Sequence, residues 1–274
     1  MAFYKIYPPE PELGKLIREI QLYHIKWDEE EENIPPYITC LANTEQNLYL
    51  FPRDPMRIVP AVNVEIPAAP AIVTGPKNRP VGLIFGKDHL MIKIAFYPTG
   101  TYRLCGTNMK ATVNAGIDAF EIWHEDINDV LAKLRQLVSY DEMIVTISDF
   151  LLRKFDAKCR PHEPIDDVAV AMLDPLAQLN IVEWASKSCL SLRQFERNFM
   201  VRVGISPKLF LRIVRFEHAM HVKNTTQASW SEIAMINGYT DSSHLLKEFK
   251  KFAHFPPSQF YLKPTSGHST LPSG

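Results

Sequence analysis

The sequence has little cysteine and no long apolar run. Its four cysteines are spread along 274 residues without a Cys-x-x-Cys pair, so neither a disulfide framework nor a zinc site is expected. No stretch reaches about 18 uncharged apolar residues, the length that a transmembrane helix needs. Prolines and glutamates interrupt the first residues, where a secretory leader needs an apolar segment. We therefore expect a cytoplasmic protein with reduced thiols and no membrane contact.

The common catalytic and metal-binding motifs are also missing. The chain has no Gly-x-Ser-x-Gly, no P-loop and no glycine-rich dinucleotide motif. His24, His89 and His124 lie far apart, without the His-x-His pair that a metal-binding barrel would require. His218 and His221 are three residues apart but lack a third ligand at suitable spacing. We therefore expect no enzymatic activity, no metal and no other cofactor.

Charge is distributed unevenly, although the net charge is only −1. Residues 1–159 contain 17 Lys and Arg against 21 Asp and Glu, a net of −4, whereas residues 190–263 contain 11 against 5, a net of +6. Such an asymmetry is typical of a chain in which one part meets a polyanion and the other does not.

The first 115 residues are rich in β-branched and aromatic runs separated by turn-forming stretches, which predicts an antiparallel sheet or a small barrel. Two of these runs, separated by Gly-Lys-Asp, predict a hairpin over 81–96. Aromatic residues in this part either line a small-molecule pocket or form ordinary core: Tyr23, Trp27, Tyr37, Tyr49 and Phe51. The expected strands are Ile17–Ile25, Tyr37–Phe51, Arg57–Val62, Ala71–Gly75, Val81–Phe85 and Leu90–Phe96.

From residue 117 the apolar residues recur three and four positions apart, which predicts two amphipathic helices within 117–155. Such a pair either covers the open face of the sheet or meets the same pair in a second subunit, as in a homodimer. Residues 156–165 contain two prolines and few apolar side chains, as expected for a linker. Residues 264–274 are rich in Ser, Pro and Gly and predict a disordered tail.

The C-terminal hundred residues contain one pattern twice, at 180–210 and 229–260. The two copies match at an offset of 49 before an internal turn and of 50 after it. The matched positions are those that would form a small core, which predicts two similar helical units. After the turn, Phe195, Phe199, Ile205, Pro207 and Phe210 match Leu245, Phe249, Phe255, Pro257 and Phe260.

Capping residues mark where the helices of each unit begin. Asn180, Ser191 and Ser229 are each followed three positions later by Glu or Gln, an arrangement that satisfies the free amides of a first turn. A helix of about eight residues, a turn and a helix of about twelve form a helix-turn-helix, whose second helix enters the major groove of DNA. Ser206 and Pro207 begin a long helix between the units.

The second helix of each unit leaves polar side chains outside its apolar stripe. In the first unit the stripe comprises Leu192, Phe195, Phe199 and Val203. Outward arginines suit guanine edges and lysines suit phosphates, whereas Glu196 either accepts from cytosine or pairs with a nearby arginine. The predicted DNA-contacting residues are Ser191, Arg193, Gln194, Glu196, Arg197, Ser242, Ser243, His244, Lys247 and Lys251.

With these motifs, residues 164–261 resemble the AraC-type (AraC/XylS) transcriptional regulators, whose DNA-binding domain has two helix-turn-helix units joined by a long helix. The first turn departs from the family pattern, since Cys189 occupies a position where glycine is usual. His254-Phe255-Pro256 replaces the small residue and glycine expected before Pro257. The matching residues are Ala185, Leu190-Ser191, Phe195, Phe199, Gly204, Ser206-Pro207 and Arg215, then Ile233-Ala234, Gly238-Tyr239, Asp241, Ser243, Phe249-Lys250-Lys251, Pro257 and Phe260.

Together these patterns predict an α+β fold with a mostly-β, sensor-like regulatory domain at 1–155 and an all-α double helix-turn-helix domain at 166–263. The predicted partners are double-stranded DNA, a second copy of the chain and a small-molecule effector. The resemblance favours an activator, for which RNA polymerase would be a partner, although no residue shows such a contact. The alternative is a ligand-binding or enzymatic β domain whose helical tail mediates protein association.

Overall fold

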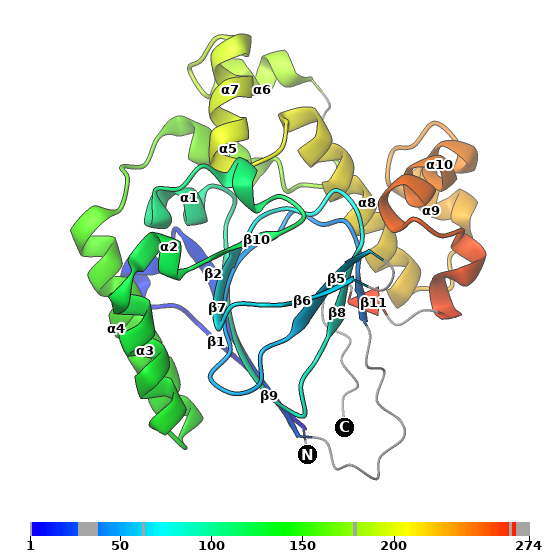
Figure 1. Ribbon diagram of the computed structural model, residues 1–274. Helices are drawn as coiled ribbons and strands as arrows, with labels where there is room; N and C mark the ends of the chain where they lie inside the picture. The colour runs from blue at the N-terminus through cyan, green and yellow to red at the C-terminus, as the bar shows by residue number, and fades with distance from the viewer. Residues whose placement is uncertain (1, 27–37, 62–63, 178–179, 263–264, 267–274) are drawn as a thin grey trace.

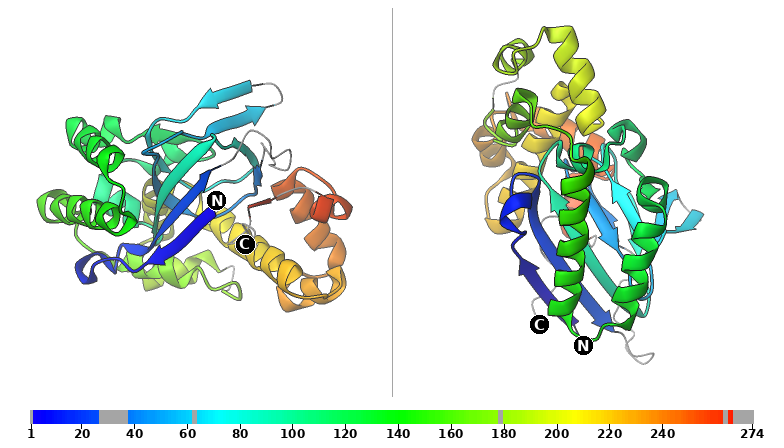
Figure 2. Two further views of the ribbon diagram at one scale, coloured as in Figure 1. Left: turned by 90° about the horizontal axis from the view of Figure 1, so that it is seen from below. Right: turned by 90° about the vertical axis from the view of Figure 1, so that its left-hand side faces the viewer.

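A computed structural model describes residues 2–26, 38–61, 64–177, 180–262 and 265–266. The N-terminal part consists of two β-sheets, and the C-terminal part is helical (Figure 1). Helices α3 (Glu125–Gln136) and α4 (Tyr140–Lys158) lie on one side of the strands. Helices α8 (Pro207–Thr225), α9 (Trp230–Ile236) and α10 (Ser242–Ala253) lie on the other (Figure 2). This arrangement agrees with the predicted α+β class. Among the described residues, no helix has the length and apolarity needed to cross a bilayer.

The larger sheet has six strands in the order β1-β2-β9-β4-β7-β10, all paired antiparallel. Along β4, Leu48 and Leu50 belong to the core beneath the helices, whereas Tyr49 packs with residues of the second sheet. The sheet therefore has an apolar outer face and a mixed inner face. The strands are β1 (Ala2–Tyr7), β2 (Ile17–Lys26), β4 (Gln46–Leu50), β7 (Ala71–Thr74), β9 (Asp88–Phe96) and β10 (Gly116–Asp118).

The smaller sheet faces the inner side of the first and has the order β11-β3-β8-β5-β6. A small buried cluster that includes Phe51, Met56 and Ile72 lies between the sheets. Its strands are β3 (Ile38–Cys40), β5 (Arg57–Ala61), β6 (Val64–Pro67), β8 (Val81–Ile84) and β11 (Thr265–Ser266).

The predicted hairpin over 81–96 is wrong. Strand β8 pairs with β3 and β5, whereas β9 pairs with β2 and β4, so the connection between them crosses from one sheet to the other. The expected strand Tyr37–Phe51 is also two strands, β3 and β4, in different sheets. Apolar alternation identifies a strand but not its neighbours, and short turn signals do not distinguish a hairpin from a corner between sheets. Strands β1, β6, β10 and β11 were not predicted from the sequence.

Helices α3 (Glu125–Gln136) and α4 (Tyr140–Lys158) use their apolar stripes to cover the outer face of the six-stranded sheet. Ile127, Leu134 and Ile147 are fully buried there. The sequence left two alternatives for this helix pair, covering the open face of the sheet or meeting the same pair in a second subunit. In the structure the pair covers the sheet. The short helices of this part are α1 (Gly100–Cys105), α2 (Phe120–Trp123) and the 3₁₀ turns η1 (Pro11–Leu13) and η2 (Met109–Thr112).

The remaining helices form the C-terminal part. Between α4 and α5 the chain is non-helical only at 159–163, so the expected linker 156–165 is helical at both ends. Thr265 and Ser266 pair with β3, and at these two residues the prediction of a disordered tail is wrong; residues 264 and 267–274 lie outside the described residues. The helices are α5 (Pro164–Ala171), α6 (Ile181–Lys187), α7 (Leu192–Val203), α8 (Pro207–Thr225), α9 (Trp230–Ile236), α10 (Ser242–Ala253) and η3 (Pro257–Leu262).

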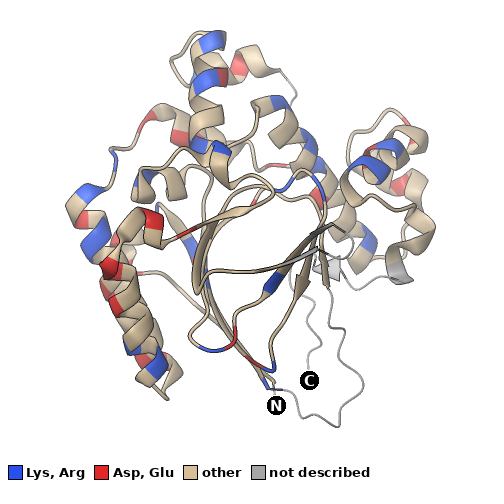
Figure 3. Cartoon of the chain, in the orientation of Figure 1, with Lys and Arg blue, Asp and Glu red and all other residues tan. Residues whose placement is uncertain are grey.

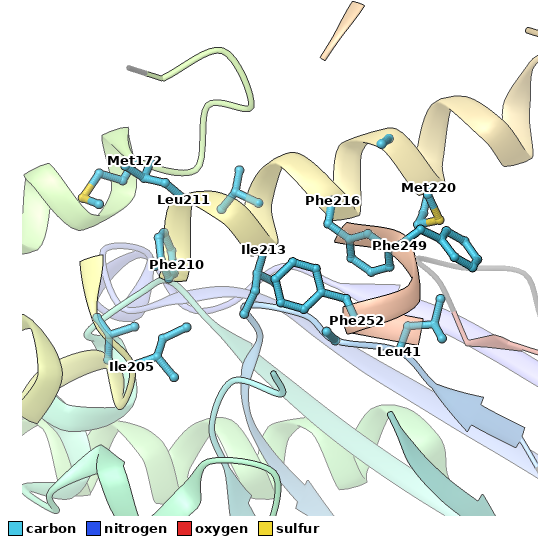
Figure 4. Packing of buried hydrophobic residues seen from close by; sticks show 14 of the residues in the cluster. Leu41, Met172, Ile205, Phe210, Leu211, Ile213, Phe216, Met220, Phe249 and Phe252 are labelled. Carbon is cyan, nitrogen blue, oxygen red and sulfur yellow. The ribbon is translucent and has the colours of Figure 1, made fainter. Parts of the chain in front are cut away.

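A second core holds these helices together along α8. Phe210 and Phe216 project from α8 toward opposite ends of this core. Phe249 and Phe252 of α10 pack against Phe216 (Figure 4). Leu41, from the loop after β3, belongs to the same core. Helix α8 is therefore a common support for the helical units and contacts the β part as well.

Candidate nucleic-acid interface

The structure contains the two helix-turn-helix units that the repeat predicts. In the first, α6 has seven residues and α7 has twelve; in the second, α9 has seven and α10 has twelve. Helix α8, of 19 residues, joins them. The matched core positions are buried in both units, with Phe195 and Phe199 equivalent to Leu245 and Phe249. The internal repeat in the sequence is thus a repeat in structure.

The turns inside the two units have the same backbone geometry. Cys189 has φ +56° and Gly238, 49 positions later, has φ +65°. In the first turn the Leu190 amide donates to the Ala185 carbonyl at 3.1 Å; in the second the Tyr239 amide donates to the Ala234 carbonyl at 2.9 Å. This bond across a left-handed residue is the usual end of a helix. Cys189 therefore adopts the conformation that glycine adopts in the second unit.

Polar caps fix the start of each second helix. Ser191 and Gln194 form a reciprocal capping box at α7, in which the Ser191 hydroxyl donates to Gln194 Oε1 at 2.8 Å. At α10, Asp241 Oδ1 accepts from the His244 amide at 2.8 Å. Ser229 and Glu232 form a second capping box at α9. Because these side chains bind one another, Ser191 and Gln194 define where α7 begins.

The predicted DNA-contacting residues lie at the surface of α7 and α10, apart from Ser242, which is half-buried. Figure 3 shows basic segments on both helices. The inward stripe differs from the prediction at Leu192, which is 41% exposed, because it lies in the first turn of α7, before the helix reaches the core. The exposed members of the set are Ser191, Arg193, Gln194, Glu196 and Arg197 on the first unit and Ser243, His244, Lys247 and Lys251 on the second.

A buried ion cluster that the sequence analysis missed attaches the first unit to the rest of the molecule. Arg202 of α7 contacts Asp166 of α5 at 3.0 Å and also pairs with Glu163. Arg103 of α1 lies 3.8 Å from the same Asp166 carboxylate. The guanidinium of Arg202 stacks over Tyr102. The sequence did contain a signal, because Arg202 lies three residues after Phe199 and hence on the apolar face of the helix.

Two polar contacts attach the second unit to α8. Arg212 of α8 donates from Nε to Oε2 of Glu248 of α10 at 3.0 Å, and this hydrogen bond to the carboxylate raises the pKa of Arg212. His218 of α8 lies 2.6 Å, Nδ1 to Oδ1, from the buried Asn237 at the end of α9. His218 therefore has a structural partner within the helical domain. Among the described residues, no group of three or more His, Cys, Asp or Glu side chains is placed to hold a metal ion.

A family model described as a helix-turn-helix domain matches residues 184–262. An uncharacterized HTH-type transcriptional regulator of Haemophilus influenzae is 31% identical over 97 residues, covering 35% of this chain and 33% of the relative. The HTH-type transcriptional regulator MtrA of Neisseria gonorrhoeae is 29% identical over 86 residues, covering 31% of this chain and 29% of MtrA. The activator RhaS of Escherichia coli is 30% identical over 79 residues, covering 28% of each chain. The chain thus spans about a third of the length of these relatives.

Among solved structures, ToxT of Vibrio cholerae aligns over 95% of this chain and 98% of its own, with 12% identity and a TM-score of 0.44. This likeness is too distant to assign a function. The family model matches the helical part, where the two units and their connecting helix are found. The helix-turn-helix domain matched at residues 184–262, together with the HTH-type regulators among the relatives, confirms the resemblance of this part of the chain to AraC-type regulators that the motifs predicted.

Proposed function

We propose that the protein is a sequence-specific DNA-binding transcriptional regulator in which α7 and α10 enter neighbouring stretches of the major groove. The observation that carries this proposal is the pair of matching capped units joined by one helix. At about 1.5 Å per residue, the 19 residues of α8 extend roughly 28 Å, close to the roughly 34 Å of one DNA turn. Two units held at this spacing by α8 can contact the same face of one DNA duplex.

The exposed residues of each helix have distinct roles in this proposal. Arg193 and Arg197 suit bidentate bonds to guanine, whereas Lys247 and Lys251 suit phosphates. Glu196 suits cytosine or a neighbouring arginine. Ser242, Ser243 and His244 begin α10, where backbone amides and short side chains approach the DNA backbone. Ser191 and Gln194 act mainly by fixing the start of α7.

The inner face of the six-stranded sheet supports control by a small-molecule effector. Asn47 and Thr74 face each other across β4 and β7, and both are buried. Asn47 Oδ1 and Thr74 Oγ1 have no hydrogen-bond partner among the described residues. Lys93 is bound to Glu45 at 2.9 Å on the same side. Buried polar atoms without partners are rare and suit a polar ligand.

A direct contact leads from this inner face toward the DNA-binding units. Thr44, next to Glu45, donates its backbone amide at 3.1 Å and its hydroxyl at 2.7 Å to Glu217 of α8. A ligand that moved Glu45 would therefore act on the helix that supports both units. Tyr23, Tyr49 and Phe51 also belong to this part of the molecule, whereas Trp27 and Tyr37 lie outside the described residues.

In this proposal the protein works without enzymatic chemistry in the cytoplasm, where duplex DNA is available. The apolar stripes of α3 and α4 are used within the molecule, so a homodimer would form elsewhere. Strand β1 ends the six-stranded sheet and exposes Tyr4 and Ile6, which suits pairing with β1 of a second copy. Sedimentation of the full chain measures this association. A contact with RNA polymerase is predicted by the family resemblance alone.

The proposal is tested by the salt dependence of binding to duplex DNA pools, followed by selection of the bound sequences. Neutralising roughly 6 to 10 phosphates would lower affinity about 10³- to 10⁵-fold between about 50 and 200 mM salt. Selection should enrich one sequence. If the helical tail only mediated protein association, duplex binding would be absent or insensitive to sequence.

A further inference from the structure

Basic side chains from three separate parts of the chain surround one surface hollow. It has a volume of about 560 Å³ and lies between the loop before β8, the first turns of α8 and the end of α10. None of the described residues that line it is acidic. The charged and titratable lining residues are Arg79 from the loop, Lys208 and Arg212 from α8, Lys251 from α10 and His254 directly after α10.

Among the described residues, Arg212 is the one cation of this set that has a carboxylate partner. Glu248 binds the guanidinium of Arg212 from the side of α10. Arg79, Lys208 and Lys251 are exposed and form no ion pair with any residue that the structure describes. Three uncompensated positive charges around one hollow repel each other, and an anion between them removes that repulsion.

The start of α8 adds to the positive potential. Ser206 caps the helix, and Lys208 lies in its first turn. The aligned peptide dipoles of a 19-residue helix leave partial positive charge at this end, which favours phosphate and similar anions. Helix end, side chains and hollow therefore favour the same class of ligand.

We propose that this hollow is a phosphate-binding site. The phosphate comes either from the backbone of bound DNA or from a free phosphate-bearing ligand. Only the first source rests on the proposed function, in which Lys251 already belongs to the DNA-contacting set. Because Arg79 belongs to the β part and Lys208 and Lys251 to the helical part, an occupied site ties the two parts together.

The test uses the full chain and three single variants: R79Q, K208Q and the control R53Q. Arg53 is exposed and does not line the hollow. Calorimetric titration with inorganic pyrophosphate at constant ionic strength probes the free ligand. Binding of a random-sequence duplex at several salt concentrations probes the DNA backbone. Thermal melting verifies that each variant is folded.

If the site holds a free ligand, pyrophosphate binds the unchanged chain saturably. R79Q and K208Q then lower the affinity for pyrophosphate about tenfold, and R53Q leaves it unchanged. If the site holds a phosphate of bound DNA, pyrophosphate does not bind. R79Q and K208Q then each lower duplex affinity, and each reduces the slope of log affinity against log salt concentration by about 0.9, the value for one phosphate. The proposal is overturned if R79Q and K208Q match the unchanged chain in both assays, or if R53Q has the same effect. A chain that binds pyrophosphate but no duplex would refute the proposed function and leave this site standing.

Discussion

At the scale of single residues, the turns before α7 and α10 show how strongly one backbone position constrains the residue type that it accepts. Cys189 and Gly238 share a left-handed conformation, which costs a residue with a β-carbon about 1 kcal/mol more than glycine. A β-carbon on Gly238 would meet no atom within 4 Å, so its cost is backbone strain alone. We expect Cys189→Gly to raise the free energy of unfolding by about 1 kcal/mol and Gly238→Ala to lower it similarly. Urea unfolding measures both, and changes of the same sign would contradict the shared geometry.

His89 provides a prediction about pH. It is 1% exposed, and burial lowers its pKa to about 4, against about 6.5 in an unfolded chain. Between these values the unfolded chain binds a proton that the folded chain does not, so stability is lost as pH falls from about 6.5 to about 4, by on the order of 3 kcal/mol. Phe85 and Phe51 lie against the ring, so His89→Phe should fit. Urea unfolding across this range should show a flatter pH dependence for the variant; an identical dependence would mean that His89 titrates normally.

At the scale of elements, Asp166 binds α5 to α7 and approaches Arg103 of α1. Removing one member of a buried ion pair leaves the other charge buried without a partner, at a cost of about 3 to 5 kcal/mol. We expect this loss of stability for Asp166→Ala. The matched control is Asp167→Ala on the same helix. Its carboxylate is 76% exposed, and among the residues that the structure describes it pairs with His162 alone. This variant should cost less than about 1 kcal/mol. Equal losses in thermal unfolding would show that the cluster has no special role.

The elements also show which features the sequence could predict. Both helix-turn-helix units followed from the repeat and from caps such as Ser191 and Ser229, because these signals lie within a few residues. The partners of β8 and β9 did not follow, since pairing depends on contacts between distant segments. Arg202 and Arg103 meet at Asp166 only after α1, α5 and α7 are packed. The outward direction of Arg193 and Lys247 was predictable, because helical periodicity determines it.

At the scale of the whole molecule, the helical domain shares contacts with the β part. Leu41 and Ala42 belong to its core, and Gln46 donates to the Val203 carbonyl at 3.5 Å. A β-carbon on Gly204 would lie 2.7 Å from the Met109 carbonyl oxygen, which shows how closely the parts approach. We expect a fragment of residues 160–263 to bind duplex DNA but to unfold at a lower temperature than the full chain. Equal melting temperatures, measured by circular dichroism, would show that these contacts contribute little.

The central claim is that the two units bind one duplex together, each reading its own part of the site. A hydroxyl-radical footprint on the selected sequence, with the unchanged chain, Arg197→Ala and Lys247→Ala, tests it most directly. We predict two protected tracts about one helical turn apart. Arg197→Ala should weaken protection in one tract and Lys247→Ala in the other. A single tract for the unchanged chain, or the same loss in both tracts for both variants, would contradict the account.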